Sequence, residues 1–237
     1  MNEQRLDGWL HFENAVEKGR AARSNRSILY RGQRNSAWVL ETTLERHGKR
    51  NFSATDYSKT LHSAASTIET VTGKRWSIDD DSSLDHDVPR CPPNYPLMAF
   101  LRQNGFPSPL LDWSRSPYVA AFFAFNHASA STEEYVAIYE YQEYGPDGKS
   151  GEPSEATIRS LGPWIATDKK HFLQQSEYTV CWRRSGDSLS YSSHEEVFAR
   201  NEGGQDILVK YLIPVSEKEL VLKRLRRYNV TAYCVFR

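Results

Sequence analysis

The sequence QNGFPSPLLDWSRSPYVAAFFAF, residues 103–125, sets an apolar turn with one carboxylate, Asp112, directly before an apolar helix. Ser116 is a natural N-cap, and the proline after it fits the first helical position because its missing N–H would have no partner there. Residues 118–125 are apolar on nearly every side, so the helix they form should be buried. We expect the start of this helix to face the same space as Asp112 and Ser114 and to form a pocket for a polar or anionic ligand.

The composition limits the classes of partner. The chain has 237 residues, with 30 Lys and Arg against 30 Asp and Glu, so its formal net charge is +0. No global field draws it to nucleic acid or to an anionic membrane, and any nucleic-acid contact must be local. No apolar run approaches the roughly 20 residues of a membrane span, and the first residues lack the apolar segment of a secretion signal. The cysteines, Cys91, Cys181 and Cys234, are widely spaced and fit reduced thiols, so we expect a soluble, cytoplasmic protein without a membrane partner.

Helical and strand patterns follow one another irregularly along the chain. Helical patterns cover residues 7–23, 55–71, 95–102 and 118–125, and Ser216 with Glu219 resembles a capping box for a helix that ends at Tyr228. Strand patterns cover residues 27–30, 135–141, 177–182, 207–215 and 230–236, and Arg31-Gly32-Gln33 should end the first of them. The acidic, proline-containing segment at about 79–93 is expected to be a mobile surface loop. This irregular order favours a single α+β domain over a doubly wound sheet.

Several motifs resemble those of the FRG domain, a family named for its Phe/Tyr-Arg-Gly motif. They are YRGQ at residues 30–33, WVLETTLER at 38–46, the stretch 103–125, KHFLQQSEYT at 170–179 and YSSHE at 191–195, and similarity extends through residues 207–233. The resemblance covers nearly the whole chain, so residues 1–237 are interpreted as one FRG domain that includes the helix at 7–23. It implies an ADP-ribosyltransferase-like split β-sheet core with flanking helices.

The resemblance also implies a function. It suggests a toxin or effector, of the kind found in toxin–antitoxin and antiviral defence settings, that transfers ADP-ribose from NAD to an intracellular macromolecule. RNA or another nucleic acid is slightly favoured over protein as the acceptor, because local basic runs could hold phosphates. A cognate antitoxin or chaperone is expected as a partner. The alternatives are a non-catalytic nucleotide- or polyanion-binding module and an NAD glycohydrolase.

Cleavage of the nicotinamide–ribose bond needs a grip on phosphate or ribose, an aromatic wall and a carboxylate near the ribose. The residues assigned to catalysis are Arg31, Asp112, Ser114, Glu195 and Glu177, the two glutamates being the candidates for the activating acid. The residues assigned to binding NAD are Tyr30, Arg31, Gly32, Gln33, Trp113, Gln175 and Tyr178. A simpler interpretation is also open, in which Arg31 forms a buried structural ion pair with Asp112 and the serines only cap the helix.

No metal site is expected, because His194-Glu195-Glu196 lacks the second histidine of the H-E-x-x-H zinc motif. The resemblance further implies an acidic, apolar helical tail after the last strand, whereas this sequence ends at Arg237. If the key acid belongs to that tail, the chain would be a truncated or weakened form; otherwise the tail is dispensable.

Overall fold

A mixed nine-stranded sheet forms the centre of the structure, a computed structural model that describes residues 1–22, 27–78, 91–130, 132–143, 154–200 and 206–236. The strands are β1 (Asn2–Arg5), β2 (Leu29–Gln33), β3 (Phe52–Ser53), β4 (Leu110–Ser114), β5 (Tyr135–Gln142), β6 (Thr157–Ser160), β7 (Ser176–Ser185), β8 (Ser188–Tyr191) and β9 (Ile207–Pro214). Their order is β1-β9-β5-β2-β4-β7-β8-β3, with β6 paired to β7. The β1–β9 pair is parallel, and the other pairs are antiparallel.

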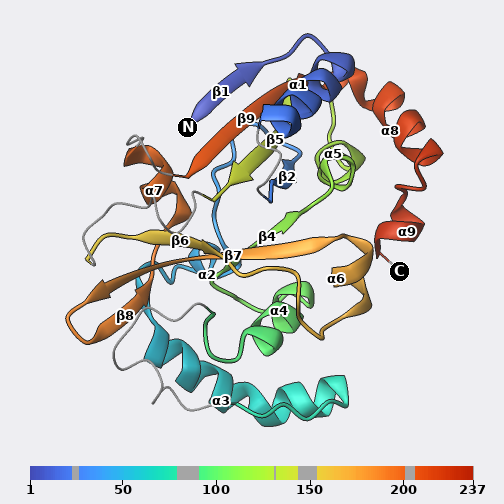
Figure 1. The fold of residues 1–237 in the computed structure, drawn as a ribbon. Coiled ribbons are helices and arrows are strands. Elements are labelled where there is room, and N and C mark those ends of the chain that lie inside the picture. Colours follow the sequence, from blue (N-terminus) through green and yellow to red (C-terminus); the bar gives the residue numbers. More distant parts are fainter. Residues whose placement is uncertain (23–26, 79–90, 131, 144–153, 201–205, 237) are drawn as a thin grey trace.

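Helices flank the sheet in two groups (Figure 1). They are α1 (Trp9–Ala22), α2 (Thr43–Arg46), α3 (Ala54–Thr72), α4 (Tyr95–Gln103), α5 (Pro117–Asn126), α6 (Lys169–Leu173), α7 (His194–Arg200), α8 (Lys218–Arg227) and α9 (Ala232–Phe236). One hydrophobic core joins α1, α5 and α8 to β5 and β9, a second joins α3 and α4 to β7 and β8, and a third joins β2 and β5 to β4, β7 and α7. The described residues therefore form a single α+β domain, as the pattern predicted.

The sheet is split at its centre. β2 pairs with β5 along its whole length, and β4 pairs with β7 along its whole length. Between β2 and β4, however, the described register has one residue pair, Tyr30 with Ser114. The strands diverge beyond that pair, and Arg31 crosses the gap to Asp112. Two half-sheets, β1-β9-β5-β2 and β4-β7-β8-β3, thus meet at one narrow junction.

Helix α5 lies where the sequence places it, and its burial explains its composition. The Ser116 hydroxyl accepts a hydrogen bond from the Val119 N–H at 3.3 Å, and Pro117 occupies the first turn. The helix packs on β2 so closely that a Cβ added to Gly32 would lie 1.9 Å from the Ala120 carbonyl oxygen. Gly32 is therefore required for the contact between α5 and the sheet.

Two predictions about strands are corrected by pairing that is distant in sequence. Residues Leu110–Ser114, expected as an apolar turn, form β4, because β7 pairs with them from Leu110–Val180 to Ser114–Ser176. Arg31-Gly32-Gln33, expected to end a strand, continues β2 because β5 supplies partners up to Gln33–Ala137. The local sequence does not indicate these strand partners, because β2 contains polar residues and prolines precede β4.

The C-terminal segment also differs from expectation. Residues expected as a last strand at 230–236 form α9, where Thr231 Oγ1 accepts from the Cys234 N–H at 3.3 Å as an N-cap. The capping box of Ser216 and Glu219 does not form. Glu217 occupies the N-cap of α8 after a short 3₁₀ turn, Val215–Glu217, and its carboxylate accepts from the Trp9 N–H at 3.0 Å instead.

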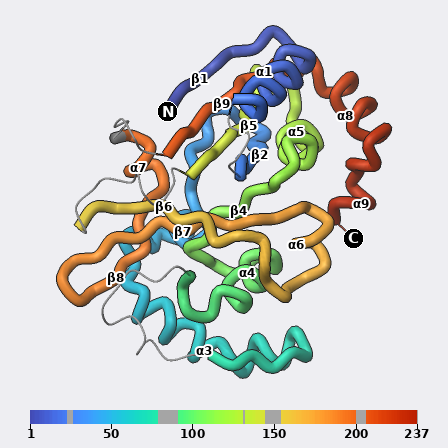
Figure 2. Tube along the Cα trace, viewed as in Figure 1, coloured from blue at the N-terminus to red at the C-terminus, as the bar shows by residue number. Residues whose placement is uncertain are grey.

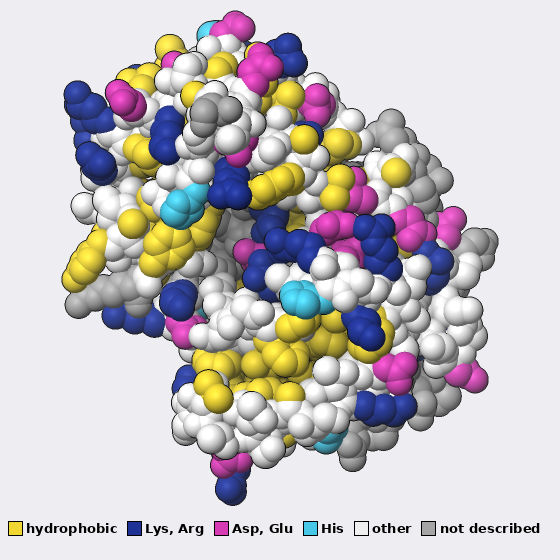
Figure 3. Space-filling model, turned by 180° about the vertical axis from the view of Figure 1, so that it is seen from behind, with side chains coloured by type: hydrophobic (Ala, Val, Ile, Leu, Met, Phe, Trp, Pro, Cys, Tyr) yellow, Lys and Arg dark blue, Asp and Glu magenta, His cyan; other side chains and the backbone are white. Residues whose placement is uncertain are grey.

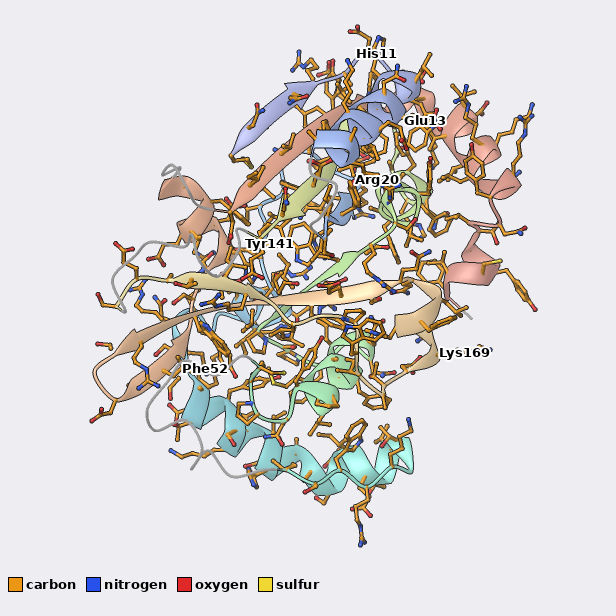
Figure 4. The ribbon with its side chains drawn as sticks, viewed as in Figure 1. His11, Glu13, Arg20, Phe52, Tyr141 and Lys169 are labelled. Carbon is orange, nitrogen blue, oxygen red and sulfur yellow. The ribbon has the colours of Figure 1, made fainter. Side chains whose placement is uncertain are left out.

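Contacts between the two ends of the chain and the middle complete the domain. Arg224 on α8 donates to Glu13 on α1 at 2.7 Å, and Figure 4 shows Glu13 on the α1 helix near α8. The end of the described chain lies beside α6 (Figure 2), where Gln174 Nε2 donates to the Val235 carbonyl at 3.1 Å. A membrane-crossing helix is absent from the described part of the chain, since each helix there is too short or too polar. Most of the loop predicted at 79–93 lies outside the described residues.

Candidate functional site

A cavity of about 720 Å³ opens where β2 and β4 diverge. Its walls come from β2, the segment that follows it, β4, α2 and α5. The volume lies within the roughly 300–1,000 Å³ of small-molecule sites. Figure 3 shows Lys and Arg side chains gathered around a hollow in the face turned away from the view of Figure 1. The split in the sheet thus supplies a site large enough for a nucleotide.

Asp112 is held between two arginines at this cavity. Arg31 Nη1 donates to Asp112 Oδ1 at 2.8 Å and to its carbonyl oxygen at 2.7 Å, and Arg102 Nη2 donates to the same Oδ1 at 2.6 Å. The side chains of Arg31 and Arg102 are 14% and 17% exposed, and that of Asp112 is 35% exposed. Desolvation favours the neutral carboxyl, but the charges of Arg102 and Arg31 outweigh it and hold the pKa of Asp112 well below its usual value. The ion pair considered from sequence is therefore confirmed, with Arg102 as an additional partner.

The cavity lining carries more positive than negative charge. Arg31, Arg34 and Arg46 line it, against the carboxylates of Asp112 and Glu41. Glu41 is paired with Arg50. Arg46 has no ion pair within the described part of the chain, and burial, followed by the charges of Arg31 and Arg102, lowers its pKa. An arginine remains protonated at neutral pH in spite of such a shift, so Arg46 offers an anion an uncompensated charge.

The structure gathers most, but not all, of the residues that the sequence singled out. Tyr30, Arg31, Gly32, Gln33, Asp112, Trp113 and Ser114 border the cavity, whereas Gln175, Glu177, Tyr178 and Glu195 do not. Gln174, the neighbour of Gln175, is the member of that pair that lines it. The motif at 170–179 thus reaches the site through Gln174 and Ser176, and not through the residues expected.

Several bordering side chains are already engaged with the protein. Ser114 Oγ donates to the Gln174 carbonyl at 2.7 Å and accepts from the Ser116 N–H at 3.0 Å, so it fixes the start of α5. Gln33 Nε2 donates to the Val39 carbonyl at 3.1 Å and fixes the segment after β2. These bonds give Ser114 and Gln33 roles in shaping the cavity wall.

The aromatic surface differs from the one expected. Trp113 is 3% exposed, and Tyr178 is fully buried with its hydroxyl bonded to Gln103 Nε2 at 2.8 Å. Trp38, in contrast, lines the cavity with 46% of its surface exposed, and the Arg34 guanidinium lies 5.0 Å from its ring centroid. The motif at 38–46 therefore contributes Trp38, Glu41 and Arg46, which the sequence analysis used for family resemblance alone.

The two glutamates proposed as the activating acid lie behind the cavity wall. Glu177 is 4% exposed and accepts from the Ser160 hydroxyl at 2.5 Å, and burial raises its pKa. Glu195 Oε1 accepts from the Leu40 N–H at 2.8 Å, which anchors the wall segment from outside the cavity. Asp112 and Glu41 are the carboxylates that line the cavity in the described chain.

A buried hydrogen-bond chain supports β4 from behind. Trp113 Nε1 donates to Thr179 Oγ1 at 2.9 Å, and that hydroxyl lies 2.9 Å from His194 Nε2. An indole N–H can only donate, so the hydroxyl accepts it and can give its own proton to Nε2 of a neutral imidazole. Burial, together with the charge of Arg31, lowers the pKa of His194 to about 3. The ring is thus neutral in the folded protein at physiological pH.

This histidine should make stability depend on pH. The unfolded state binds the proton at pH values below about 6.5, whereas folded His194 does not, so the free energy of unfolding should decrease as the pH falls from about 6.5 towards 3. The contribution of one such group approaches about 1.4 kcal/mol per pH unit. Urea unfolding between these pH values should show a smaller slope for His194→Gln than for the wild type. His11→Gln, which replaces an exposed imidazole on α1, is the control; an unchanged slope in His194→Gln would contradict the prediction.

The fold and the site together define an α+β domain with a positively charged cavity at a split in its sheet. Comparison with family models identifies part of this domain: residues 26–133 match the model of the FRG domain. The match includes β2, the motif at 38–46, β4 and α5, which form most of the cavity. No curated protein and no solved structure matched the chain.

Proposed function

We propose that this FRG domain binds NAD in the cavity between β2 and β4 and transfers its ADP-ribose to an intracellular macromolecule. The observation that carries the proposal is the cluster of Arg31 and Arg46 in a cavity of about 720 Å³. Two guanidinium groups suit the pyrophosphate, because each offers several donors in a fixed plane. The exposed ring of Trp38 offers a stacking surface for one of the two bases.

The reaction requires a bond to break and a proton to move. The N-glycosidic bond of NAD breaks, nicotinamide leaves with the electron pair, and a nucleophilic atom of the acceptor bonds to the ribose C1′ while its proton passes to a carboxylate. Asp112 is kept ionised by two arginines and is therefore a weak base. Glu41, the other carboxylate in the described lining, is paired with one exposed arginine, Arg50, instead of two partly buried ones, and we assign it the proton transfer.

One observation favours a second candidate function. The glutamates expected to act on the ribose, Glu177 and Glu195, are both hydrogen-bonded outside the cavity. A nucleotide-binding module without turnover would need only the arginines. Water as the acceptor would give an NAD glycohydrolase instead.

Labelled NAD separates these functions. The purified chain is incubated with labelled NAD and a cell lysate, and parallel samples are treated with nuclease or protease. Label that only nuclease removes identifies a nucleic-acid acceptor, and label that only protease removes identifies a protein. Free nicotinamide without labelled macromolecule identifies hydrolysis, and NAD binding without nicotinamide release identifies the binding module. The absence of both binding and release would contradict the proposal.

Arg46 gives a test that spares the fold. Arg46→Ala removes a cavity cation without leaving a carboxylate unpaired, so the protein should stay folded while the Kd for NAD rises about tenfold, as expected for a lost charged hydrogen bond of roughly 1.5 kcal/mol. Arg75→Ala, which removes a side chain that is 86% exposed, is the matched control and should leave the Kd unchanged. Calorimetric titration measures both. Equal Kd values for Arg46→Ala and the wild type would place the phosphates elsewhere.

An ADP-ribosyltransferase of this kind would endanger the cell that makes it. We therefore propose that a cognate antitoxin or chaperone binds the protein in its host. Co-expression with neighbouring genes, scored by recovery of growth, would identify such a partner.

A further inference from the structure

A second, smaller cavity of about 250 Å³ adjoins the first. It is lined by Arg102, Gln103, Asp112, Phe123, Lys170, Gln174 and Phe236. Three of these residues, Asp112, Phe123 and Gln174, also line the larger cavity, so the two spaces share a wall. The smaller volume is below the roughly 300 Å³ at which small-molecule sites begin, so it suits one ring of a larger ligand.

The charge of this cavity favours an anion. Arg102 and Lys170 are its cations, and Asp112 is its carboxylate. Asp112 is already shared between Arg102 and Arg31, which leaves the Lys170 ammonium as surplus positive charge. Lys169, the residue before it in the sequence, also belongs to α6 (Figure 4) and is exposed. A chain of phosphates passing over α6 would meet both lysines.

The two glutamines present acceptors. Gln103 Nε2 donates to the Tyr178 hydroxyl at 2.8 Å, and Gln174 Nε2 donates to the Val235 carbonyl at 3.1 Å. Each amide nitrogen thus uses one of its two N–H groups within the protein, and each amide oxygen has no hydrogen-bond donor among the described residues. Each of these amides therefore presents an acceptor oxygen and one further N–H donor, and the edges of nucleobases carry both donors and acceptors.

Aromatic rings complete the lining. The rings of Phe123 and Phe236 lie with centroids 5.7 Å apart at an interplanar angle of 75°. Phe236 is 44% exposed, so part of its side chain is accessible to a ligand. Any nucleobase can stack on such a ring, and the lysines can bind the phosphates of the nucleic-acid backbone.

We propose that the smaller cavity is the acceptor subsite, and that it takes one nucleotide of a single-stranded nucleic acid. The inference rests on the proposed function for the transfer step, but the binding of the strand can be tested without it. The shared wall at Asp112 and Gln174 brings a base in the smaller cavity next to NAD in the larger one. A nucleic acid is favoured over an acidic peptide because stacking surface, amide acceptors and cations occur together.

Binding of labelled oligonucleotides tests the inference. Fluorescence anisotropy is measured with RNA and DNA single strands of about 12 nucleotides at about 50 and about 200 mM salt, with and without NAD. Phe236→Leu should keep the apolar packing and weaken strand binding about fivefold or more through lost stacking, and Lys170→Ala should weaken it about threefold and reduce its salt dependence. Lys18→Ala, which removes an exposed charge on α1, is the control for charge alone.

The outcomes separate this inference from the proposed function. Strand binding that both Phe236→Leu and Lys170→Ala weaken, without competition from NAD, supports the acceptor subsite. If NAD fails to bind but the variants still weaken strand binding, the proposed function is wrong and the nucleic-acid site remains. Equal strand binding by all variants, displacement of the strand by NAD, or label found on protein alone would overturn the inference.

Discussion

Gly32→Ala is expected to prevent stable folding of the domain. The added methyl group would lie 1.9 Å from the Ala120 carbonyl oxygen and 2.7 Å from the Ala124 nitrogen, and both are backbone atoms of α5. A side chain can rotate away from such a clash, but this helix can relieve it only by moving off β2. Overpacking usually costs about 1–3 kcal/mol, and a shift of a buried helix should exceed that range. Soluble yield and the urea midpoint measure the effect.

Gly19→Ala is the matched control for this substitution. A Cβ at Gly19 would approach the Glu140 carboxylate oxygens at 3.2 and 3.3 Å, and those are side-chain atoms. Within α1 the change also gains up to about 1 kcal/mol of helix propensity. A Gly32→Ala protein with the same urea midpoint as Gly19→Ala would show that α5 does not rest on β2 as described.

Asp112→Asn is expected to have the second largest effect on stability. The amide cannot balance the charges of Arg31 and Arg102, which would then lie together in a partly buried place. Breaking a fully buried ion pair costs about 3–5 kcal/mol, and we expect about 2–3 kcal/mol because about a third of the Asp112 side chain is exposed. Arg31→Ala should cost less, because Asp112 would keep Arg102. Urea unfolding at neutral pH compares the three proteins.

The pH dependence of this loss has a defined sign. The pKa of Asp112 is lower in the folded than in the unfolded protein, so its stabilisation is complete above the unfolded value of about 4 and is lost as the pH falls below it. The wild type should therefore approach Asp112→Asn in stability as the pH decreases from about 4. A difference that stays constant over that range would mean that the asparagine acts through packing alone.

The sequence predicted those helices and strands that are determined by residues close together in the chain. The helix α5 follows from Ser116, Pro117 and an apolar run, and the strand β5 follows from alternation at residues 135–141. The strand β4 was missed because its evidence is the pairing with β7, more than sixty residues later. The helix α9 was missed because five apolar residues do not distinguish a strand from a short helix, and the cap at Thr231 was not considered.

The candidate site was predicted only in part, because some of its residues are brought together by parts of the chain that are distant in sequence. Arg31 and Asp112 belong to strong motifs, and their pairing was among the interpretations of the sequence. Arg102 lies in the last turn of α4, where a basic residue is common on any helix, so its sequence position does not indicate a partner for Asp112. Arg46 and Trp38 likewise resemble surface residues until the diverging strands create the cavity that they line. No pattern in the local sequence indicates that two neighbouring strands will diverge and leave a cavity between them.

The narrow junction of the sheet has a consequence for how the domain unfolds. In most sheets the backbone ladder makes neighbouring strands melt together, but the described ladder between β2 and β4 has the single pair Tyr30–Ser114. Cooperativity between the two half-sheets must then come from side chains: from the bridge of Arg31 to Asp112, and from a hydrophobic cluster that joins β2 and β5 to β4 and β7. A molecule bound across the gap would link the two half-sheets. Binding in the cavity should therefore make the two half-sheets unfold more cooperatively.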